Sequence, residues 1–362
     1  MRGHRRKESG EAASAAGYHG VMLKARTLLG VLMATLAVVG TAAVAGPFED
    51  AVVAREGGDY ATAMRLSRPL AEQGDPRAQL MLGILLDDGP GVPHDFAEAL
   101  RWFRWAADQG NARAQSRVGR MYQLGRGVVQ DYAWALYWYR KAAEQGDATA
   151  QSNLGAMYSS GQGVARDDAE AIRWFRKAAE QGDQAAQLLL GVKHQRGVGV
   201  AKDYAEAARW FRKAAEHGSA IGQRSLGRAY EVGEGVPRDQ TQAARWFRKA
   251  ADQGDAMAQS GLGKAYATGE GVPRDLAQAA HWFRKAADQG DATAQGRLGV
   301  MYFDGVGVPQ DYVQAYMWLN LSASQGIKPA AVERDKLAQR MTPTQIAEAQ
   351  KLARDRKPRP ER

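Results

Sequence analysis

The 362-residue chain contains no cysteine. This absence excludes a disulfide framework, a thiolate metal centre, a cysteine nucleophile and a lipid-modified cysteine. The chain also lacks Gly-x-Ser-x-Gly, Gly-x-x-x-x-Gly-Lys, His-Glu-x-x-His and the penicillin-reactive Ser-x-x-Lys. It therefore has none of the usual motifs for a serine hydrolase, a zinc hydrolase or a phosphate cradle. We expect no catalytic residue, no metal site and no cofactor, and we predict that the protein is not an enzyme.

Sustained alternation of apolar and polar residues, which is typical of a half-buried strand, is absent too. A 36-residue period is present instead, and it runs through seven copies in each of three columns. The columns are Trp102, Trp138, Trp174, Trp210, Trp246, Trp282 and Trp318; Gln79, Gln115, Gln151, Gln187, Gln223, Gln259 and Gln295; and Gly83, Gly119, Gly155, Gly191, Gly227, Gly263 and Gly299. A fixed period of this length indicates stacked repeats, in which each unit buries its apolar face against its neighbours.

Each 36-residue unit is predicted to form two helices, as residues 147–182 illustrate. Asp147 suits the N-cap of the first helix, and apolar side chains then recur along one helical face. Gly161 ends this helix, because glycine tolerates the positive φ that a tight exit needs. Asp167 caps the second helix, and we expect Glu170 to complete a capping box with it. The predicted fold class is all-α, a helix-turn-helix repeat.

The second helix of the unit carries an apolar stripe that includes Trp174 and Phe175. We expect the tryptophan to fill the wedge between its own helix pair and the next unit, while Gly155 and Ala171 let the two helix backbones approach. The cations of the recurring phrase RWFRKAAEQGD, residues 173–183, are then solvated and do not form a nucleic-acid stacking surface. The formal net charge of +9 lies mainly in the two ends of the chain, which also argues against a nucleic-acid partner.

The repeating pattern A-x-A-Q-x-x-L-G-x-x-Y-x-x-G-x-G-V-x-x-D-x-x-x-A-x-x-W-x-x-x-A-A-x-x-G resembles the Sel-one-like repeat family, which is related to the tetratricopeptide repeat. The resemblance covers residues 75–326 in seven consecutive copies. It implies a right-handed α-solenoid that acts as a protein-binding scaffold, and it implies no substrate.

The segments on either side of the repeats differ from them. Residues 46–74 are predicted to form a shorter capping hairpin, with Leu66 in the tryptophan column. Residues 327–362 are predicted to form capping helices and a basic tail, in which Thr342 is the N-cap of a last helix and Gln345 closes its capping box. Atypical end units are what a stacked array needs in order to stop stacking.

The N-terminal part of the chain is predicted to hold an export signal in residues 22–45. Lys24 and Arg26 form a basic start, an apolar run follows, and an Ala-x-Ala cleavage site precedes Gly46. We expect cleavage at this site and therefore a periplasmic or secreted protein.

Two other interpretations concern the same region. Residues 1–21 are charged and resemble neither the signal nor the repeats, so we interpret them as a mis-assigned start or an extension. The uncharged stretch 27–48 is long enough to span a membrane. If the signal is not cleaved, an inner-membrane anchor is the alternative.

His194 stands in a column that is tyrosine in five other units, namely Tyr122, Tyr158, Tyr230, Tyr266 and Tyr302. A histidine in a core column is more often packed than a metal ligand. We therefore expect His194 to be a buried, hydrogen-bonded core residue.

A helical wheel at 100° per residue separates two sides of the first helix of each unit. The columns of residues 150, 151, 154, 155 and 158 stay constant among the copies and lie on one side. The columns of residues 149, 152, 153, 156 and 160 vary and lie on the opposite side. Variation marks a surface that packing does not constrain, and in related helical repeats this side lines a concave groove. The candidate partner-binding residues on it are Arg117, Arg120, Asn153, Arg224, Arg228, Lys264 and Arg297, with the apolar Leu189 and Val192 between them.

The sequence therefore predicts an exported, non-enzymatic repeat scaffold that binds a protein or peptide through its concave face. The cations on that face favour an acidic partner. A solvent-exposed face whose sequence has drifted without any binding role would show the same pattern. The alternative function is a cell-envelope factor that binds peptidoglycan or regulates a cell-wall enzyme.

Overall fold

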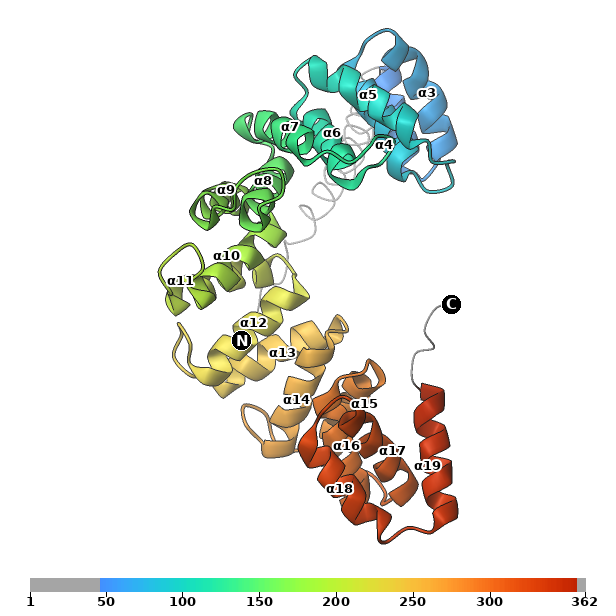
Figure 1. Cartoon of the computed structure of the whole chain (residues 1–362), viewed down its shortest axis with the longest axis vertical. Coiled ribbons are helices and arrows are strands. Elements are labelled where there is room, and N and C mark those ends of the chain that lie inside the picture. The colour runs from blue at the N-terminus through green and yellow to red at the C-terminus, as the bar shows by residue number, and fades with distance from the viewer. Residues whose placement is uncertain (1–45, 357–362) are drawn as a thin grey trace, which may run out of the picture. The chain divides into compact units, whose positions relative to one another are not determined.

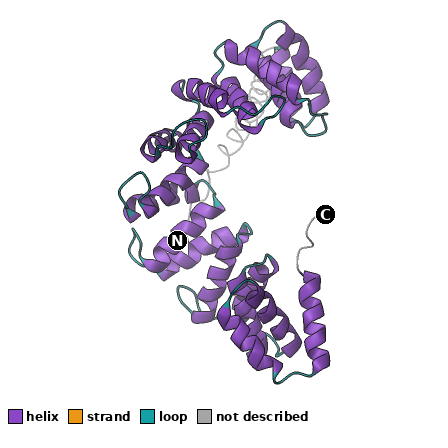
Figure 2. Ribbon diagram, in the orientation of Figure 1, coloured by secondary structure: helices purple, strands orange, loops and turns teal. Residues whose placement is uncertain are grey.

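The computed structural model describes residues 46–356 and shows eighteen helices and no strand in that part of the chain (Figure 2). The all-α class is therefore confirmed. The predicted export signal in residues 22–45 and the end of the basic tail lie outside the described residues. Among the described helices, none combines the length and the apolar content that a membrane span would need.

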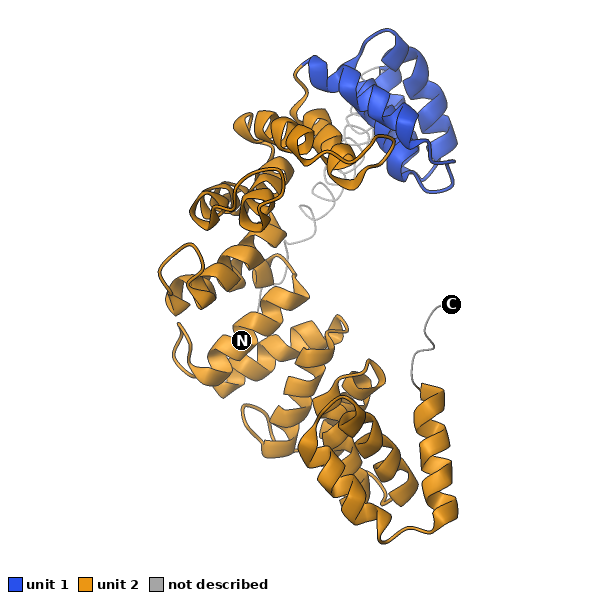
Figure 3. Ribbon diagram, viewed as in Figure 1, with its two compact units in different colours: residues 1–109 blue, residues 110–362 orange. Residues whose placement is uncertain are grey.

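The chain divides into two compact units at residues 109 and 110 (Figure 3). The first unit contains α2 (Pro47–Glu56), α3 (Tyr60–Glu72), α4 (Pro76–Asp88) and α5 (Phe96–Asp108). The second unit contains α6 (Ala112–Leu124), α7 (Tyr132–Glu144), α8 (Ala148–Ser160), α9 (Asp168–Glu180), α10 (Gln184–Arg196), α11 (Tyr204–Glu216), α12 (Ala220–Val232), α13 (Gln240–Asp252), α14 (Ala256–Thr268), α15 (Leu276–Asp288), α16 (Ala292–Asp304), α17 (Tyr312–Ser324), α18 (Lys328–Ala338) and α19 (Pro343–Arg356).

Within each unit, consecutive helices pack against one another along the chain (Figure 1). The even-numbered helices α6 to α16 are the first helices of their repeats, and the odd-numbered helices α7 to α17 are the second helices. At the C-terminal end, α17 packs against both α18 and α19. This nearest-neighbour arrangement of 36-residue helix pairs is that of an α-solenoid.

The glycine column lets an aromatic ring lie directly on the first helix. A Cβ added to Gly155 would lie 2.8 Å from the Phe175 ring and 3.1 Å from the carbonyl oxygen of Ala171. The exit glycine Gly161 has φ +75°, as predicted. A second loop glycine, Gly163, has φ +70°, and a Cβ there would lie 2.5 Å from the carbonyl oxygen of Tyr132 in the preceding repeat. The loops therefore contribute to the contact between repeats.

The capping prediction is half correct for the second helices. The Asp167 carboxylate accepts from the Glu170 amide at 2.9 Å. The return bond of a capping box is not formed, because the Asp167 amide already donates to the carbonyl oxygen of Tyr158 at 2.9 Å. The Glu170 side chain instead pairs with Arg173 at 3.0 Å. At α19 both halves of the predicted box are present between Thr342 and Gln345.

The glutamine column joins neighbouring repeats through buried hydrogen bonds. The Nε2 atom of Gln151 donates to the carbonyl oxygen of Ala143 at 3.1 Å, and its Oε1 atom accepts from Gln181 at 2.8 Å. The same pair of bonds recurs at Gln223 and Gln259. A buried amide with both ends satisfied fixes the register of one repeat on the next at little desolvation cost.

Five tryptophans of the column are buried and Trp174 and Trp246 are half-buried, but the column faces the opposite neighbour from the one predicted. Trp210, on α11, is 5% exposed and packs with Leu190 of its own repeat and with Ala171 and Phe175 of the preceding one. The Nζ atom of Lys213 lies 4.3 Å from the centre of the Trp210 ring and covers its outer face. The recurring basic-aromatic phrase is therefore a packing element.

His194 is buried, as expected, with 5% of its surface exposed. The expected hydrogen bond is wrong, because neither ring nitrogen has a partner. The tyrosines of this column bond to an arginine on the preceding second helix, as Tyr158 does with Arg140 at 2.8 Å. The shorter imidazole does not place a polar atom where the phenol hydroxyl would be.

Candidate partner-binding face

In the second unit, the constant columns of the first helices are buried except for the half-buried tyrosines, and the variable columns are half-buried or exposed except at the buried Ser116. On α8, Gln151 and Leu154 are buried, while Thr149 and Ser160 are exposed. We call the surface formed by positions 149, 152, 153, 156 and 160 and their 36-residue equivalents in the second unit the first-helix face. The wheel argument therefore placed the two sides of these helices correctly.

Arg117 and Arg120 lie at the α6 end of the first-helix face, and both are half-buried. They are close to Tyr139 of α7, whose hydroxyl donates to Gln123 at 2.9 Å. Burial raises the pKa of the Tyr139 hydroxyl far above its usual value, and the positive charges of Arg120 and Arg117 act in the opposite direction. These two arginines therefore belong partly to the hairpin formed by α6 and α7.

The middle of the face is mixed in character. Asn153 and Val192 are half-buried, and Leu189 is exposed. Arg228, on α12, is exposed. These side chains are accessible to a partner, and they lie on different repeats.

Arg224 has a structural role that the sequence pattern did not predict. Its Nη1 atom lies 3.0 Å from Oδ2 of Asp255, and only 28% of the Arg224 side chain and 10% of the Asp255 side chain are exposed. Asp255 also caps α14 by accepting from the Ala258 amide at 2.8 Å. In the same column, the Ser152 hydroxyl lies 3.2 Å from the equivalent cap residue Asp183. This column therefore touches the N-cap of the next repeat.

Lys264 and Arg297 line one cavity of about 560 Å³ on the first-helix face, near the C-terminal end of the array. The cavity lies between α14, α16 and α18, and its floor is apolar, with Phe283, Met301 and Leu319 among its residues. Lys264 also pairs with Glu231 at 2.8 Å. The structure thus brings together two of the seven predicted residues in a single concave site.

Sequence reasoning missed this cavity because its depth depends on the absence of a side chain. Position 296 is glycine, where the other repeats of the second unit have Ser116, Ser152, Leu188, Arg224 and Ser260. A Cβ at Gly296 would lie 3.0 Å from the Ser322 hydroxyl and 3.7 Å from the Ala330 Cβ. The glycine in this variable column was the available signal, although Gly261 in a neighbouring variable column gives the same signal without such a cavity.

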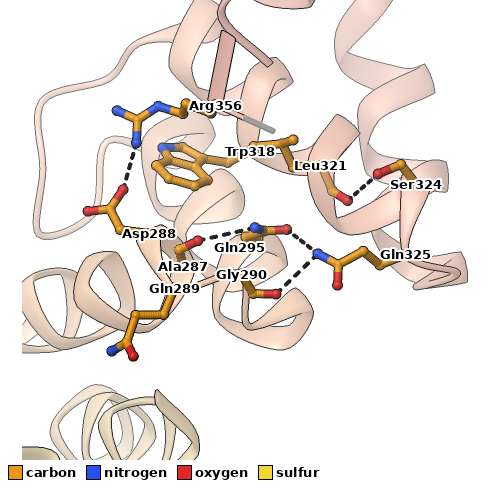
Figure 4. Close-up of a pocket in the computed structure, with 10 residues that line it drawn as sticks. All are labelled: Ala287, Asp288, Gln289, Gly290, Gln295, Trp318, Leu321, Ser324, Gln325 and Arg356. Carbon is orange, nitrogen blue, oxygen red and sulfur yellow. Dashed lines mark hydrogen bonds and ion pairs between the residues drawn. The ribbon is translucent and has the colours of Figure 1, made fainter. Parts of the chain in front are cut away.

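A second cavity, of about 480 Å³, lies where α19 meets α15 and α17 (Figure 4). Arg356 lies over the Trp318 ring at 4.7 Å and pairs with Asp288 at 2.6 Å. Gln325, also in the lining, donates to Gln295 at 2.9 Å and to the Gly290 carbonyl oxygen at 3.2 Å. The polar groups that converge here are paired within the chain. We therefore interpret this cavity as part of the packing of α19 against the last repeats, and not as a binding site.

A family profile described as Sel1 repeat matches the chain seven times in succession, over residues 76–111, 112–147, 148–183, 184–219, 220–255, 256–291 and 292–327. The chain belongs to the Sel1 repeat family. The matched Sel1 repeats begin one residue after the boundary at residue 75 that the columns indicated.

Two solved structures of other Sel1 repeat proteins are similar to this chain. A Sel1 repeat protein from Oxalobacter formigenes is 37% identical, with a TM-score of 0.60, over 80% of this chain and 89% of that one. The protein c5321, described as a protective antigen of uropathogenic Escherichia coli with an SLR fold, is 33% identical over 86% of this chain and 83% of that one, with a TM-score of 0.43. Comparison with curated proteins gives no significant match. The Sel1 repeat is a scaffold, and Sel1 repeat proteins generally bind other proteins.

Proposed function

We propose that this Sel1 repeat protein is an exported, non-enzymatic scaffold that binds a protein or peptide through its first-helix face. One observation carries the proposal. Within a single chain the buried columns stay constant, while the first-helix face changes from repeat to repeat and holds accessible cations, apolar residues such as Leu189, and a cavity. A surface that packing leaves variable is where a repeat scaffold can acquire specificity.

Site-specific photocrosslinking tests the proposal. A photoreactive residue at position 189 samples the first-helix face, and one at the exposed Lys177 of α9 samples a second helix as the matched control. We expect one protein to be captured from native envelopes through position 189 and not through position 177, and to bind the purified scaffold afterwards. Equal capture at both positions would contradict the use of the first-helix face.

Export is a separate part of the proposal. It rests on the basic start, the apolar run and the Ala-x-Ala site of residues 22–45. The intact mass of the protein recovered from the periplasm should correspond to a chain that begins at Gly46. Recovery of the unprocessed chain from the inner membrane would instead establish the anchored alternative.

The cell-envelope alternative is favoured by an exposed aromatic group on α7. Trp134 and Tyr137 are 49% and 45% exposed, and their rings meet edge to face with centres 5.5 Å apart. Exposed aromatic rings offer flat apolar surfaces on which the C–H faces of glycan sugars can stack. Sedimentation with purified peptidoglycan that is lost in Trp134→Ala, while capture through position 189 is unchanged, would support this second function.

A further inference from the structure

The cavity between α14, α16 and α18 has the composition of a site for an apolar side chain next to an anion. Its floor is formed by buried residues, of which Phe283, Leu319 and Met301 are the largest. Its wall includes Val300, which is 37% exposed. Pockets of this size that combine an apolar lining with a few polar groups are typical binding sites.

The charged side chains around this cavity differ in whether they are already paired within the chain. Lys264 pairs with Glu231, and Glu333 pairs with Lys336, each at 2.8 Å. Arg297 is exposed, and the described part of the chain gives it no ion pair or hydrogen bond. An accessible guanidinium beside an apolar floor favours an occupant that carries a carboxylate, since this group accepts two parallel hydrogen bonds from arginine.

The start of α18 adds positive potential at the same rim. The first helices of the repeats begin with a side-chain cap at Asp75, Asn111, Asp147, Asp183, Ser219, Asp255 and Asp291. The equivalent residue before α18 is Ile327, which gives no cap hydrogen bond and lines the cavity. An uncapped helix N-terminus favours negative charge nearby, in the same direction as Arg297.

Building on the proposed function, we infer that this cavity binds the free C-terminus of a partner polypeptide whose last residue is apolar. The terminal carboxylate contacts Arg297, and the last side chain lies on the floor formed by Phe283 and Leu319. The hydroxyl of Thr293 and the carboxylate of Glu333, both in the lining, suit the donors and acceptors of a peptide backbone. An acyl chain has no such groups, so the observations favour a peptide over a fatty acid.

Fluorescence anisotropy with defined probes tests this assignment on the whole chain. The probe is a labelled hexapeptide pool with five randomised positions and a C-terminal leucine. It is compared with the same pool carrying a C-terminal amide and with a pool that ends in serine. We expect the leucine carboxylate pool to bind, and both changes to weaken binding by about 10-fold or more, which is the usual effect of removing one charge-assisted contact or one buried apolar side chain.

Two variants and one control locate the site. Arg297→Gln should weaken the leucine carboxylate pool by about 10-fold and leave the amide pool unchanged. Ile327→Asp supplies the missing cap in exchange for the contact that Ile327 makes with the apolar core, and it should weaken the peptide because the new carboxylate competes for the same positive rim. Arg245→Gln, at an exposed arginine of the second helix α13 that lies outside both the cavity and the first-helix face, should change binding by less than about twofold.

Besides a complete absence of binding, three outcomes would overturn the assignment. They are equal binding of the carboxylate and amide pools, loss of binding in Arg245→Gln that matches the loss in Arg297→Gln, and displacement of the pool by decanoate at a similar concentration. If no pool binds while position 189 still crosslinks a partner, the cavity assignment fails and the scaffold function stands.

Discussion

The Nζ atom of Lys193 lies 2.6 Å from Oδ1 of Asp168, in a contact that joins α10 to the start of α9. The Lys193 side chain is 9% exposed and that of Asp168 is 16% exposed. Lys193 also donates to the Ser159 hydroxyl at 2.8 Å. This ion pair thus links two consecutive Sel1 repeats. The other repeats have leucine, methionine or alanine at the position of Lys193, and mostly larger side chains such as tyrosine at the position of Asp168.

Replacing this pair tests whether it contributes to the stability of the array or only fixes how one repeat is placed on the next. Asp168→Asn should lower the free energy of unfolding by about 3 kcal/mol, because the largely buried Lys193 ammonium loses its anionic partner and keeps neutral acceptors such as the Ser159 hydroxyl. The double change Asp168→Tyr with Lys193→Met restores the residues found at Tyr132 and Met157, and should be neutral or stabilising by about 1 kcal/mol. Urea unfolding of both variants gives the comparison. A double variant as unstable as Asp168→Asn would show that the neighbouring packing has adapted to the charges.

The same pair predicts a pH dependence. Hydrogen bonding to Lys193 lowers the pKa of the Asp168 carboxyl below its ordinary value. Because the folded-state pKa is the lower one, the pair stabilises fully above the unfolded-state pKa of about 4 and loses this contribution as the pH falls through the folded-state value. We expect the advantage of the wild type over Asp168→Asn in melting temperature to shrink between pH 6 and pH 3. A difference that stays constant over this range would contradict the assigned role of the carboxylate.

His194 offers a change that should stabilise the fold. In the neighbouring repeats Arg140 and Arg212 donate to Tyr158 and Tyr230 at 2.8 Å. Arg176 is the equivalent arginine for position 194. His194→Tyr should therefore add one hydrogen bond and remove two unpaired buried nitrogens, for a gain of about 1 kcal/mol in thermal or urea unfolding.

A matched cycle gives that prediction its control. Arg176→Ala should have little effect in the wild type and should abolish the gain in the His194→Tyr background. Destabilisation by His194→Tyr would mean that the pocket has closed around the smaller ring.

The fold was predictable from the sequence because every repeat carries the same pattern of buried residues. Constancy of the tryptophan, glutamine and glycine columns identified buried positions without any other sequence. The direction in which Trp210 packs was not predictable, since a period gives no sense of which neighbour a side chain faces. The absence of the return bond of the capping box was not predictable either. It follows from a backbone hydrogen bond between the Asp167 amide and the Tyr158 carbonyl oxygen, and side-chain patterns do not indicate such a bond.

The candidate site was predictable only in part. The helical wheel separated the accessible side of the first helices from the packed side, because surface position follows from periodicity. Partners across repeats do not follow from it. Arg224 and Asp255 are 31 residues apart, and their pairing depends on how one helix sits on the N-terminus of another. The cavity beside Arg297 depends on missing volume at Gly296, which only three-dimensional packing reveals.

Loss of a central tryptophan should divide the array. Trp210→Ala removes a side chain that is 5% exposed, and should cost about 3 to 5 kcal/mol locally. Because each repeat is coupled only to its neighbours, we expect urea unfolding followed by circular dichroism to become multiphasic, with repeats on either side that unfold separately. Trp134→Ala, at a ring that is 49% exposed, is the control and should cost less than about 1 kcal/mol. A similar small cost at position 210 would contradict the burial of the tryptophan column.

The two arginines of α12 should separate stability from recognition. Both are candidate partner-binding residues, but only Arg224 forms an ion pair with Asp255, so the two should respond differently to removal. Arg224→Ser should lower the free energy of unfolding by about 0.5 to 1.5 kcal/mol, because serine can keep only the weaker contact that Ser152 makes with Asp183. Arg228→Ala changes an exposed residue and should leave stability within about 0.5 kcal/mol of the wild type.

Partner capture should show the opposite order, because Arg228 is accessible and Arg224 is engaged within the chain. With a partner identified by crosslinking through position 189, Arg228→Ala should weaken binding by about 1 kcal/mol and make it less sensitive to salt, as expected when one cation of a recognition surface is lost. Arg224→Ser should weaken binding less, provided that the array remains folded at the temperature of the assay. Isothermal titration at two salt concentrations distinguishes the two cases. Unchanged affinity and salt dependence in Arg228→Ala would mean that the cations of the first-helix face at α12 do not contact the partner, and that recognition depends on its apolar residues.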